Sequence, residues 1–179
     1  MQYSIRRALF LLLFSSFTLH AFGADFAPAP VARHVDAALV SSVTSIAPGA
    51  PFTVALVLTM DPDWHVYWKN PGDSGLPTSI SWSLPPGFTV GELQWPVPER
   101  FVNDGRATYG YSESVLLLAV ITPPRTIQPG ARLTIGAKAE WLACKVECIP
   151  GAADLSLTLP AGRGVPGADP RWGPAIDAT

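Results

Sequence analysis

Proline and glycine punctuate this chain so regularly that it has little room for long helices. Its 179 residues include 19 prolines and 15 glycines. Pairs such as Pro48-Gly49, Pro86-Gly87 and Pro129-Gly130 separate short apolar runs. Proline interrupts helices, and both residues favour turns. Short apolar runs divided by turn residues are typical of many short β-strands and not of disorder.

The apolar runs carry the patterns expected of strands. Every second residue of 132–141 points to one face, and 52–60 is an almost continuous apolar run, typical of a buried strand. No amphipathic helix of useful length is predicted. Strands are predicted over residues 35–44, 52–60, 64–69, 78–84, 88–95, 115–121, 132–141 and 155–159. We therefore expect an all-β fold, an immunoglobulin-like antiparallel β-sandwich.

The N-terminus has the features of a signal peptide. Arg6 and Arg7 precede an apolar run over 8–22, and small residues follow, so cleavage is expected between Gly23 and Ala27. The mature protein is then exported from the cytoplasm. The chain divides into a signal peptide, a flexible lead-in, a folded domain and a linker or truncated continuation, over residues 1–24, 25–34, 35–160 and 161–179.

Both cysteines of the chain, Cys144 and Cys148, lie in one short stretch with three residues between them. In an extended strand their Cα atoms would be about 13 Å apart. A disulfide needs roughly 4.4–6.8 Å. The chain must therefore turn between the cysteines if their sulfurs are to meet, and Pro150-Gly151 is predicted to be the exit from that turn.

A disulfide in so small a ring would stabilise the fold little. Loop entropy gives about 2 kcal/mol for a ring of roughly five residues. An easily reduced pair in an exported protein suits redox exchange, because two neighbouring thiols supply both the attacking and the resolving group. Lys145 would favour a thiolate and Glu147 would oppose it, unless both are solvated surface residues. The alternatives are a passive surface disulfide and two unpaired buried thiols.

Several stretches, taken in order, resemble one known family. The stretches are Trp64-His-Val-Tyr-Trp-Lys-Asn-Pro-Gly72, Trp95-Pro-Val-Pro98, Tyr109-Gly-Tyr111 and Trp141-Leu-Ala-Cys144-Lys-Val-Glu-Cys148-Ile-Pro-Gly. They resemble the N-terminal periplasmic domain of DsbD-type thiol:disulfide interchange proteins, and most closely the branch of the suppressor-of-copper-sensitivity membrane proteins. The resemblance covers most of 35–160.

The resemblance implies an immunoglobulin-like domain with protein-disulfide reductase activity in the periplasm. Such a domain takes electrons from a membrane-embedded thiol reductase domain, in the same or a separate chain, and passes them to periplasmic thioredoxin-like proteins. It also implies that Cys148 attacks or is attacked by the partner and that Cys144 resolves the mixed disulfide. If the chain continues into a membrane section, the domain is tethered to the inner membrane.

The strand over 64–69 has two faces. Trp64, Val66 and Trp68 are predicted to face the core, as are Trp82 and Trp141 elsewhere. The opposite face, with His65, Tyr67 and Lys69, is predicted to be accessible. His65 and Tyr67 match the aromatic strand of the family and are candidates for a wall beside the cysteines. The alternative is an ordinary exposed strand face.

The long polar segment 99–111 is the candidate for a cap over the cysteines. In the DsbD type, a cap loop with an aromatic residue just before a Tyr-Gly pair shields the cysteines. Here Tyr109 and Gly110 are retained, but Thr108 stands in the place of the aromatic residue. Asp104 and Tyr109 are the cap-loop candidates, and the alternative is a plain surface loop.

Other functions have weaker support. The formal net charge of −2 leaves no basic patch for nucleic acid. No Gly-rich phosphate loop or Ser/His/Asp set is identifiable, so no cofactor is predicted. A rival reading is a copper module, in which Cys144 and Cys148 with His65 or Met60 hold Cu(I), a metal that prefers soft ligands. A third is a structural sandwich with a passive disulfide.

Overall fold

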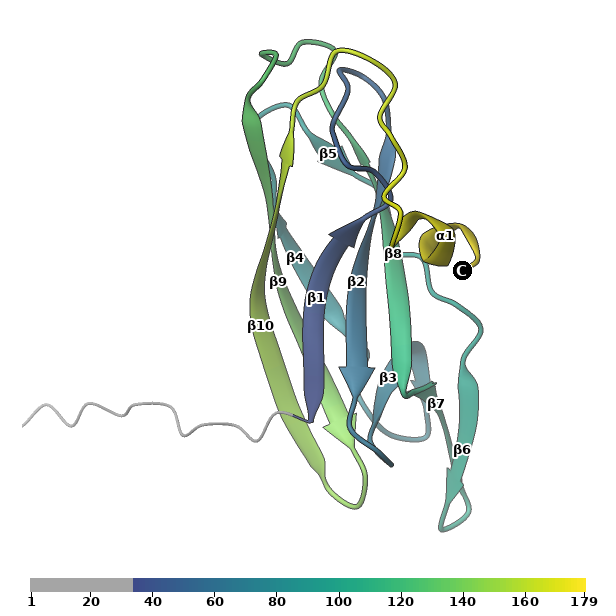
Figure 1. Ribbon diagram of the computed structural model, residues 1–179. Helices are drawn as coiled ribbons and strands as arrows, with labels where there is room; N and C mark the ends of the chain where they lie inside the picture. The colour runs from purple at the N-terminus through teal and green to yellow at the C-terminus, as the bar shows by residue number, and fades with distance from the viewer. Residues whose placement is uncertain (1–33) are drawn as a thin grey trace, which may run out of the picture.

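A computed structural model describes residues 34–179 as two antiparallel β-sheets that face each other (Figure 1). The predicted all-β, immunoglobulin-like sandwich is confirmed. The predicted signal peptide 1–24, and the lead-in up to residue 33, lie outside the described residues. Over 34–179, no helix combines the length and the apolar character that crossing a membrane requires.

The first sheet has the strand order β1-β2-β8-β5. Its strands are β1 (Val35–Ser41), β2 (Phe52–Met60), β8 (Ser114–Thr122) and β5 (Thr89–Val90). Most of β2 is buried on both of its faces. This double burial explains why its sequence is an almost unbroken apolar run and does not alternate.

The second sheet carries the cysteines and has the order β10-β9-β3-β7-β6, with β4 also paired to β9. The strands β9 and β10 form one long hairpin, and the β6–β7 hairpin turns at the same end of the sandwich (Figure 1). The strands are β3 (His65–Gly72), β4 (Ser79–Ser83), β6 (Glu99–Asn103), β7 (Arg106–Ser112), β9 (Arg132–Cys144) and β10 (Cys148–Pro160).

The core lies between the inner faces of the two sheets. Leu56 and Leu58 of β2 are fully buried against Val66 of β3 and Trp141 of β9. Burying a leucine side chain in this way contributes about 1.5–3 kcal/mol. Three other predicted core tryptophans are only partly buried, at the margins of this core: Trp64, Trp68 and Trp82.

Several local predictions were wrong. The polar segment 99–111 is not a loop but the β6–β7 hairpin. The strand predicted over 64–69 extends to residue 72, because β3 continues beyond an irregularity in its pairing. Pro150-Gly151 is not the exit from the cysteine turn but part of β10, which tolerates proline because it is an edge strand. The strand expected over 88–95 is reduced to the two residues of β5.

The segment 161–179 shows no strand or helix pattern in the sequence, yet it contacts the first sheet. Isolated bridges join Ala161 to Ile46 and Ala168 to Val43. The short helix α1 (Gly173–Asp177) then lies beside β8, where Ile176 is 5% exposed (Figure 1). The segment therefore covers part of the outer face of the first sheet.

Candidate functional site

The two cysteines form a disulfide at the turn of the β9–β10 hairpin. Cys144 ends β9, Cys148 begins β10, and the two are register partners with Cα atoms 4.2 Å apart. Lys145, Val146 and Glu147 make the turn, in which the N–H of Lys145 donates to the carbonyl of Glu147. The predicted reversal of the chain between the cysteines is confirmed, and the register of the hairpin brings the sulfurs together.

The two cysteines differ sharply in exposure. Cys144 is 3% exposed because its strand lies inside the sheet, with Cys148 on one side and His65 of β3 on the other. Cys148 is exposed because β10 is the edge strand. An incoming thiolate can therefore approach Cys148, while Cys144 is held behind it.

Tyr67 contacts the accessible cysteine. Its hydroxyl lies 3.6 Å from Sγ of Cys148 and is the donor, because a disulfide sulfur carries no hydrogen. Burial raises the pKa of Tyr67 above its ordinary value, so the hydroxyl stays protonated at neutral pH. A donor at this position would also stabilise a thiolate on Cys148 after reduction.

The expectation that Tyr67 is accessible was wrong. Tyr67 is 4% exposed although it lies on the outer face of the sheet. The loop between β3 and β4 folds over its ring, and Gly75 has a left-handed φ of 103° there. A Cβ at Gly75 would collide with the ring, so this close cover depends on glycine.

His65 lies between the buried cysteine and the β6–β7 hairpin. Its ring stacks on Phe101 with centroids 4.6 Å apart and meets the edge of Tyr67 at 5.2 Å. Burial lowers the pKa of His65, and the charge of Glu99 opposes this effect only in part. The imidazole is therefore neutral at pH 7 and can accept or donate one hydrogen bond.

A cleft of about 380 Å³ opens beside the disulfide. The cysteine hairpin forms one wall, and His65 and Tyr67 form its base. The β6–β7 hairpin forms the other wall, with Phe101 and Asp104 among its lining side chains. The structure thus brings together both cysteines and three of the other predicted site residues.

Two predicted residues do not reach the cleft. Thr108 of β7 lines it, so the next side chain, Tyr109, points to the other face of the sheet, where its ring meets Trp68 at 6.4 Å. Gly110 is buried against the backbone of Val66, which leaves no room for a Cβ. The Tyr-Gly pair therefore packs β7 on β3 and does not touch the cysteines.

Phe101 is the aromatic site residue that the sequence reasoning missed, and Ser74, Asn103 and Arg106 line the cleft without having been predicted. Phe101 is the register partner of Thr108, so an aromatic ring stands across the hairpin from the position where the family has one. A signal was present in the sequence. Asp104-Gly105 is a strong two-residue hairpin turn, and recognising it would have placed Phe101 opposite Thr108.

Lys145, which was expected to favour a cysteine thiolate, forms an ion pair with Asp63. Its Nζ lies 2.9 Å from Oδ2 of Asp63, in the loop before β3. Both side chains are largely exposed, so the pair contributes at most about 1 kcal/mol. Glu147 is exposed in the turn. The ion pair ties the cysteine turn to the neighbouring loop.

Of the residues named for a copper site, both cysteines and His65 line the cleft, whereas Met60 does not. The two sulfurs are bonded to each other, and Met60 packs in the core cluster. Within the described part of the chain, no three His, Cys, Asp or Glu side chains are arranged as a metal site would need.

Comparison with known proteins agrees with this geometry. Residues 34–160 match the family model described as thiol:disulfide interchange protein DsbD, N-terminal. No curated protein sequence matches the chain.

Two solved structures align with this chain. The N-terminal periplasmic domain of ScsB from Proteus mirabilis aligns with a TM-score of 0.56 and 19% identity, over 81% of this chain and 52% of that one. This chain therefore spans about half the length of that structure. A cohesin module from a Clostridium perfringens family 33 glycoside hydrolase aligns with a TM-score of 0.45 and 12% identity, over 72% of this chain and 98% of that one.

The ScsB domain supports the sandwich fold alone, whereas the family match covers both cysteines and both walls of the cleft. The disulfide joins Cys144 and Cys148, the only two cysteines of the sequence, and the chain belongs to the family of N-terminal domains of DsbD-type thiol:disulfide interchange proteins.

Proposed function

We propose that this domain relays electrons in the periplasm, from a membrane-embedded thiol reductase domain to thioredoxin-like proteins. The observation that carries the proposal is the unequal exposure of the two cysteines, with Cys148 open to a partner and Cys144 directly behind it. A passive disulfide needs no such arrangement. A relay needs one sulfur to be reached and the other to be protected.

In the reduced domain, the thiolate of Cys148 attacks one sulfur of the partner's disulfide. The partner's S–S bond breaks, its other cysteine leaves as a thiolate, and a mixed disulfide joins the two proteins. The thiolate of Cys144 then attacks Sγ of Cys148, and the partner's first cysteine leaves. The domain loses two electrons, and the partner gains them with two protons from solvent.

The same two sulfurs accept electrons from the membrane-embedded donor in the reverse sequence. A donor thiolate attacks Cys148, Cys144 leaves, and a second donor thiol releases the reduced domain. Tyr67 and His65 form the base of this site, and Asp104 and Phe101 on the β6–β7 wall shield the disulfide from small oxidants. A signal peptide over 1–24, as the sequence predicts, would export the domain to the periplasm, and a membrane section would tether it to the inner membrane.

The experiment that tests the relay is a trap. The variant Cys144→Ser, reduced and mixed with an oxidised periplasmic thioredoxin-like protein, should accumulate a mixed disulfide through Cys148, because the resolving thiol is missing. Non-reducing gels would show the adduct. Cys148→Ser is the matched control and should form none.

Absence of any adduct with Cys144→Ser would contradict the proposal. So would a Cys148→Ser variant that reduces the partner as well as the unaltered domain does, because that result would make the disulfide a passive one.

A further inference from the structure

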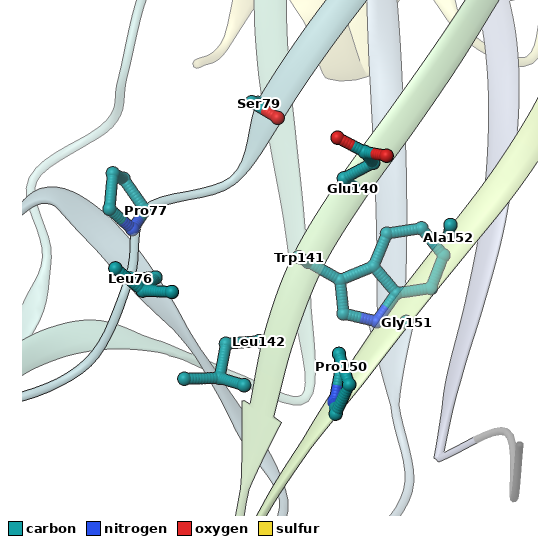
Figure 2. Close-up of a pocket in the computed structure, with 9 residues that line it drawn as sticks. All are labelled: Leu76, Pro77, Ser79, Glu140, Trp141, Leu142, Pro150, Gly151 and Ala152. Atoms are coloured by element: carbon teal, nitrogen blue, oxygen red, sulfur yellow. The ribbon is translucent and has the colours of Figure 1, made fainter.

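Besides the cleft beside the disulfide, the outer face of the same sheet carries a second cavity close to the cysteines. It is an apolar groove of about 480 Å³, between the loop before β4 and the β9–β10 hairpin. Figure 2 shows Leu76 and Pro77 on one side, Leu142 beside them, and Pro150 on the β10 side. The indole of Trp141 lies over Gly151 at its edge (Figure 2).

The groove begins two residues from the disulfide along both strands of the β9–β10 hairpin. Leu142 pairs with Pro150, and Cys144 pairs with Cys148 two residues further along each strand. Alternate residues of a strand share a face, so both pairs lie on the outer face of the sheet. Two residues along a strand correspond to about 6.6 Å. A chain segment bound at Cys148 therefore reaches the groove within two residues.

The chemistry of the groove suits an uncharged apolar side chain. Leu76 is 65% exposed, a large apolar side chain that the fold itself leaves uncovered. The charged lining residue, Glu140, lies 2.7 Å from Nζ of Lys138, so its charge is locally balanced. A charged occupant would lose water and gain no partner here.

We propose that this groove binds an apolar side chain located about two residues from the reactive cysteine of the thioredoxin-like partner. The inference rests on the proposed function, because it assigns the groove to the protein that exchanges thiols with Cys148. It makes Leu76 and Leu142 residues that select the partner, separate from the sulfur chemistry.

A pair of synthetic peptides tests the groove without the partner protein. Each carries one cysteine in a mixed disulfide with thionitrobenzoate, and phenylalanine or serine two residues away. The thiolate of Cys148 attacks the peptide sulfur, and thionitrobenzoate leaves with the electron pair. Cys144 then attacks Cys148 and releases the peptide thiol. The domain loses two electrons and the peptide disulfide gains them, so the absorbance of thionitrobenzoate reports the rate.

We expect the reduced domain to react about fivefold faster with the phenylalanine peptide, the effect of removing roughly half of an apolar side chain from water. Leu76→Ser should abolish this preference, because the groove then loses the apolar contact with the phenylalanine side chain. Leu142→Ser is the second variant. Val165→Ser is the matched control, because Val165 is 97% exposed in the C-terminal segment, remote from the groove.

Equal rates with the two peptides, or a preference that survives both groove substitutions, would overturn the assignment. So would a preference that fades as the protein concentration rises, because a second copy of the chain would then occupy the groove. These outcomes are distinct from a failure of the relay, which the Cys144→Ser trap reports independently of any side-chain preference.

Discussion

At the scale of single residues, one hydroxyl distinguishes the reactive sulfur. The hydroxyl of Tyr67 donates to Sγ of Cys148 from a ring that the β3–β4 loop covers. After reduction the same donor faces a thiolate, and a hydrogen bond to a charged group contributes about 1.5–3 kcal/mol. Tyr67 therefore holds the nucleophile in place and favours its reactive form.

Replacing Tyr67 with phenylalanine should raise the pKa of Cys148 in the reduced domain. The loss of about 1.4 kcal/mol would lower the thiolate population about tenfold at neutral pH. The rate of alkylation by iodoacetamide as a function of pH, measured in the Cys144→Ser background, reports this change. Tyr109→Phe is the control, because Tyr109 points to the other face of the sheet. Identical pH profiles for the Tyr67 variant and its parent would contradict the role.

His65 should make stability depend on pH. Burial lowers its pKa below 6.5 in the folded state, so the unfolded chain binds more protons as the pH falls through that range. The stability contribution is full above pH 6.5 and is lost as the pH falls toward the lowered pKa. Urea unfolding at pH ~7.5 and ~5.5 should show a smaller loss for His65→Gln than for the unaltered domain. An equal loss of unfolding free energy in both proteins would contradict this role of His65.

At the scale of elements, two hairpins that turn at one end of the sandwich enclose the reactive pair. The β9–β10 hairpin supplies the sulfurs, and the β6–β7 hairpin supplies Phe101 and Asp104 as the opposite wall. The β6–β7 hairpin lies at the edge of its sheet, where β6 pairs with β7 alone. Thiol exchange depends on access to the sulfur as well as on its charge.

Shortening the aromatic wall should expose the disulfide. In Phe101→Ala, His65 loses its stacking partner and the cleft widens, so dithiothreitol should reduce the Cys144–Cys148 bond severalfold faster. Val102→Ala is the control in the same strand, because Val102 is 59% exposed and does not line the cleft. Equal reduction rates for the two variants would show that Phe101 does not shield the pair.

At the scale of the whole molecule, the C-terminal segment completes the sandwich. Ile176 of α1 packs with Val40, Ala55, Val57 and Leu118 on the outer face of the first sheet. That face would otherwise expose a contiguous apolar surface, which soluble proteins rarely do unless it is a binding site. Residues 161–179 therefore contribute to the folded unit although their sequence has no strand or helix pattern.

Truncating this contact should lower stability. Ile176→Ala should reduce the free energy of unfolding by about 2 kcal/mol, the lower end of the range for a buried isoleucine, because the site is at the surface of the sandwich. Val165→Ala, at a position 97% exposed in the same segment, should change it by less than about 0.5 kcal/mol. Urea unfolding monitored by tryptophan fluorescence gives both values. Equal urea midpoints for the Ile176→Ala and Val165→Ala variants would mean that the C-terminal segment does not stabilise the first sheet.

The sequence alone determined the features that arise from neighbouring residues. Proline and glycine spacing, with alternation in segments such as 132–141, specified the all-β sandwich, because the period of a strand is a local property. The separation of Cys144 and Cys148 required a turn if the sulfurs were to bond, because an extended chain would hold them too far apart.

Only the tertiary structure decided which groups reach the sulfurs. Alternation placed Tyr67 on an outer face, but its burial depends on how the β3–β4 loop, with Gly75, folds back over its ring. Because β7 is a strand, alternation directs Tyr109 away from the cleft. Phe101 lines the cleft because β6 pairs with β7 and places it opposite Thr108. Cys148 is exposed because β10 is the edge strand of its sheet among residues 34–179. These outcomes depend on how strands and loops pack against one another, which the period of a single strand does not contain.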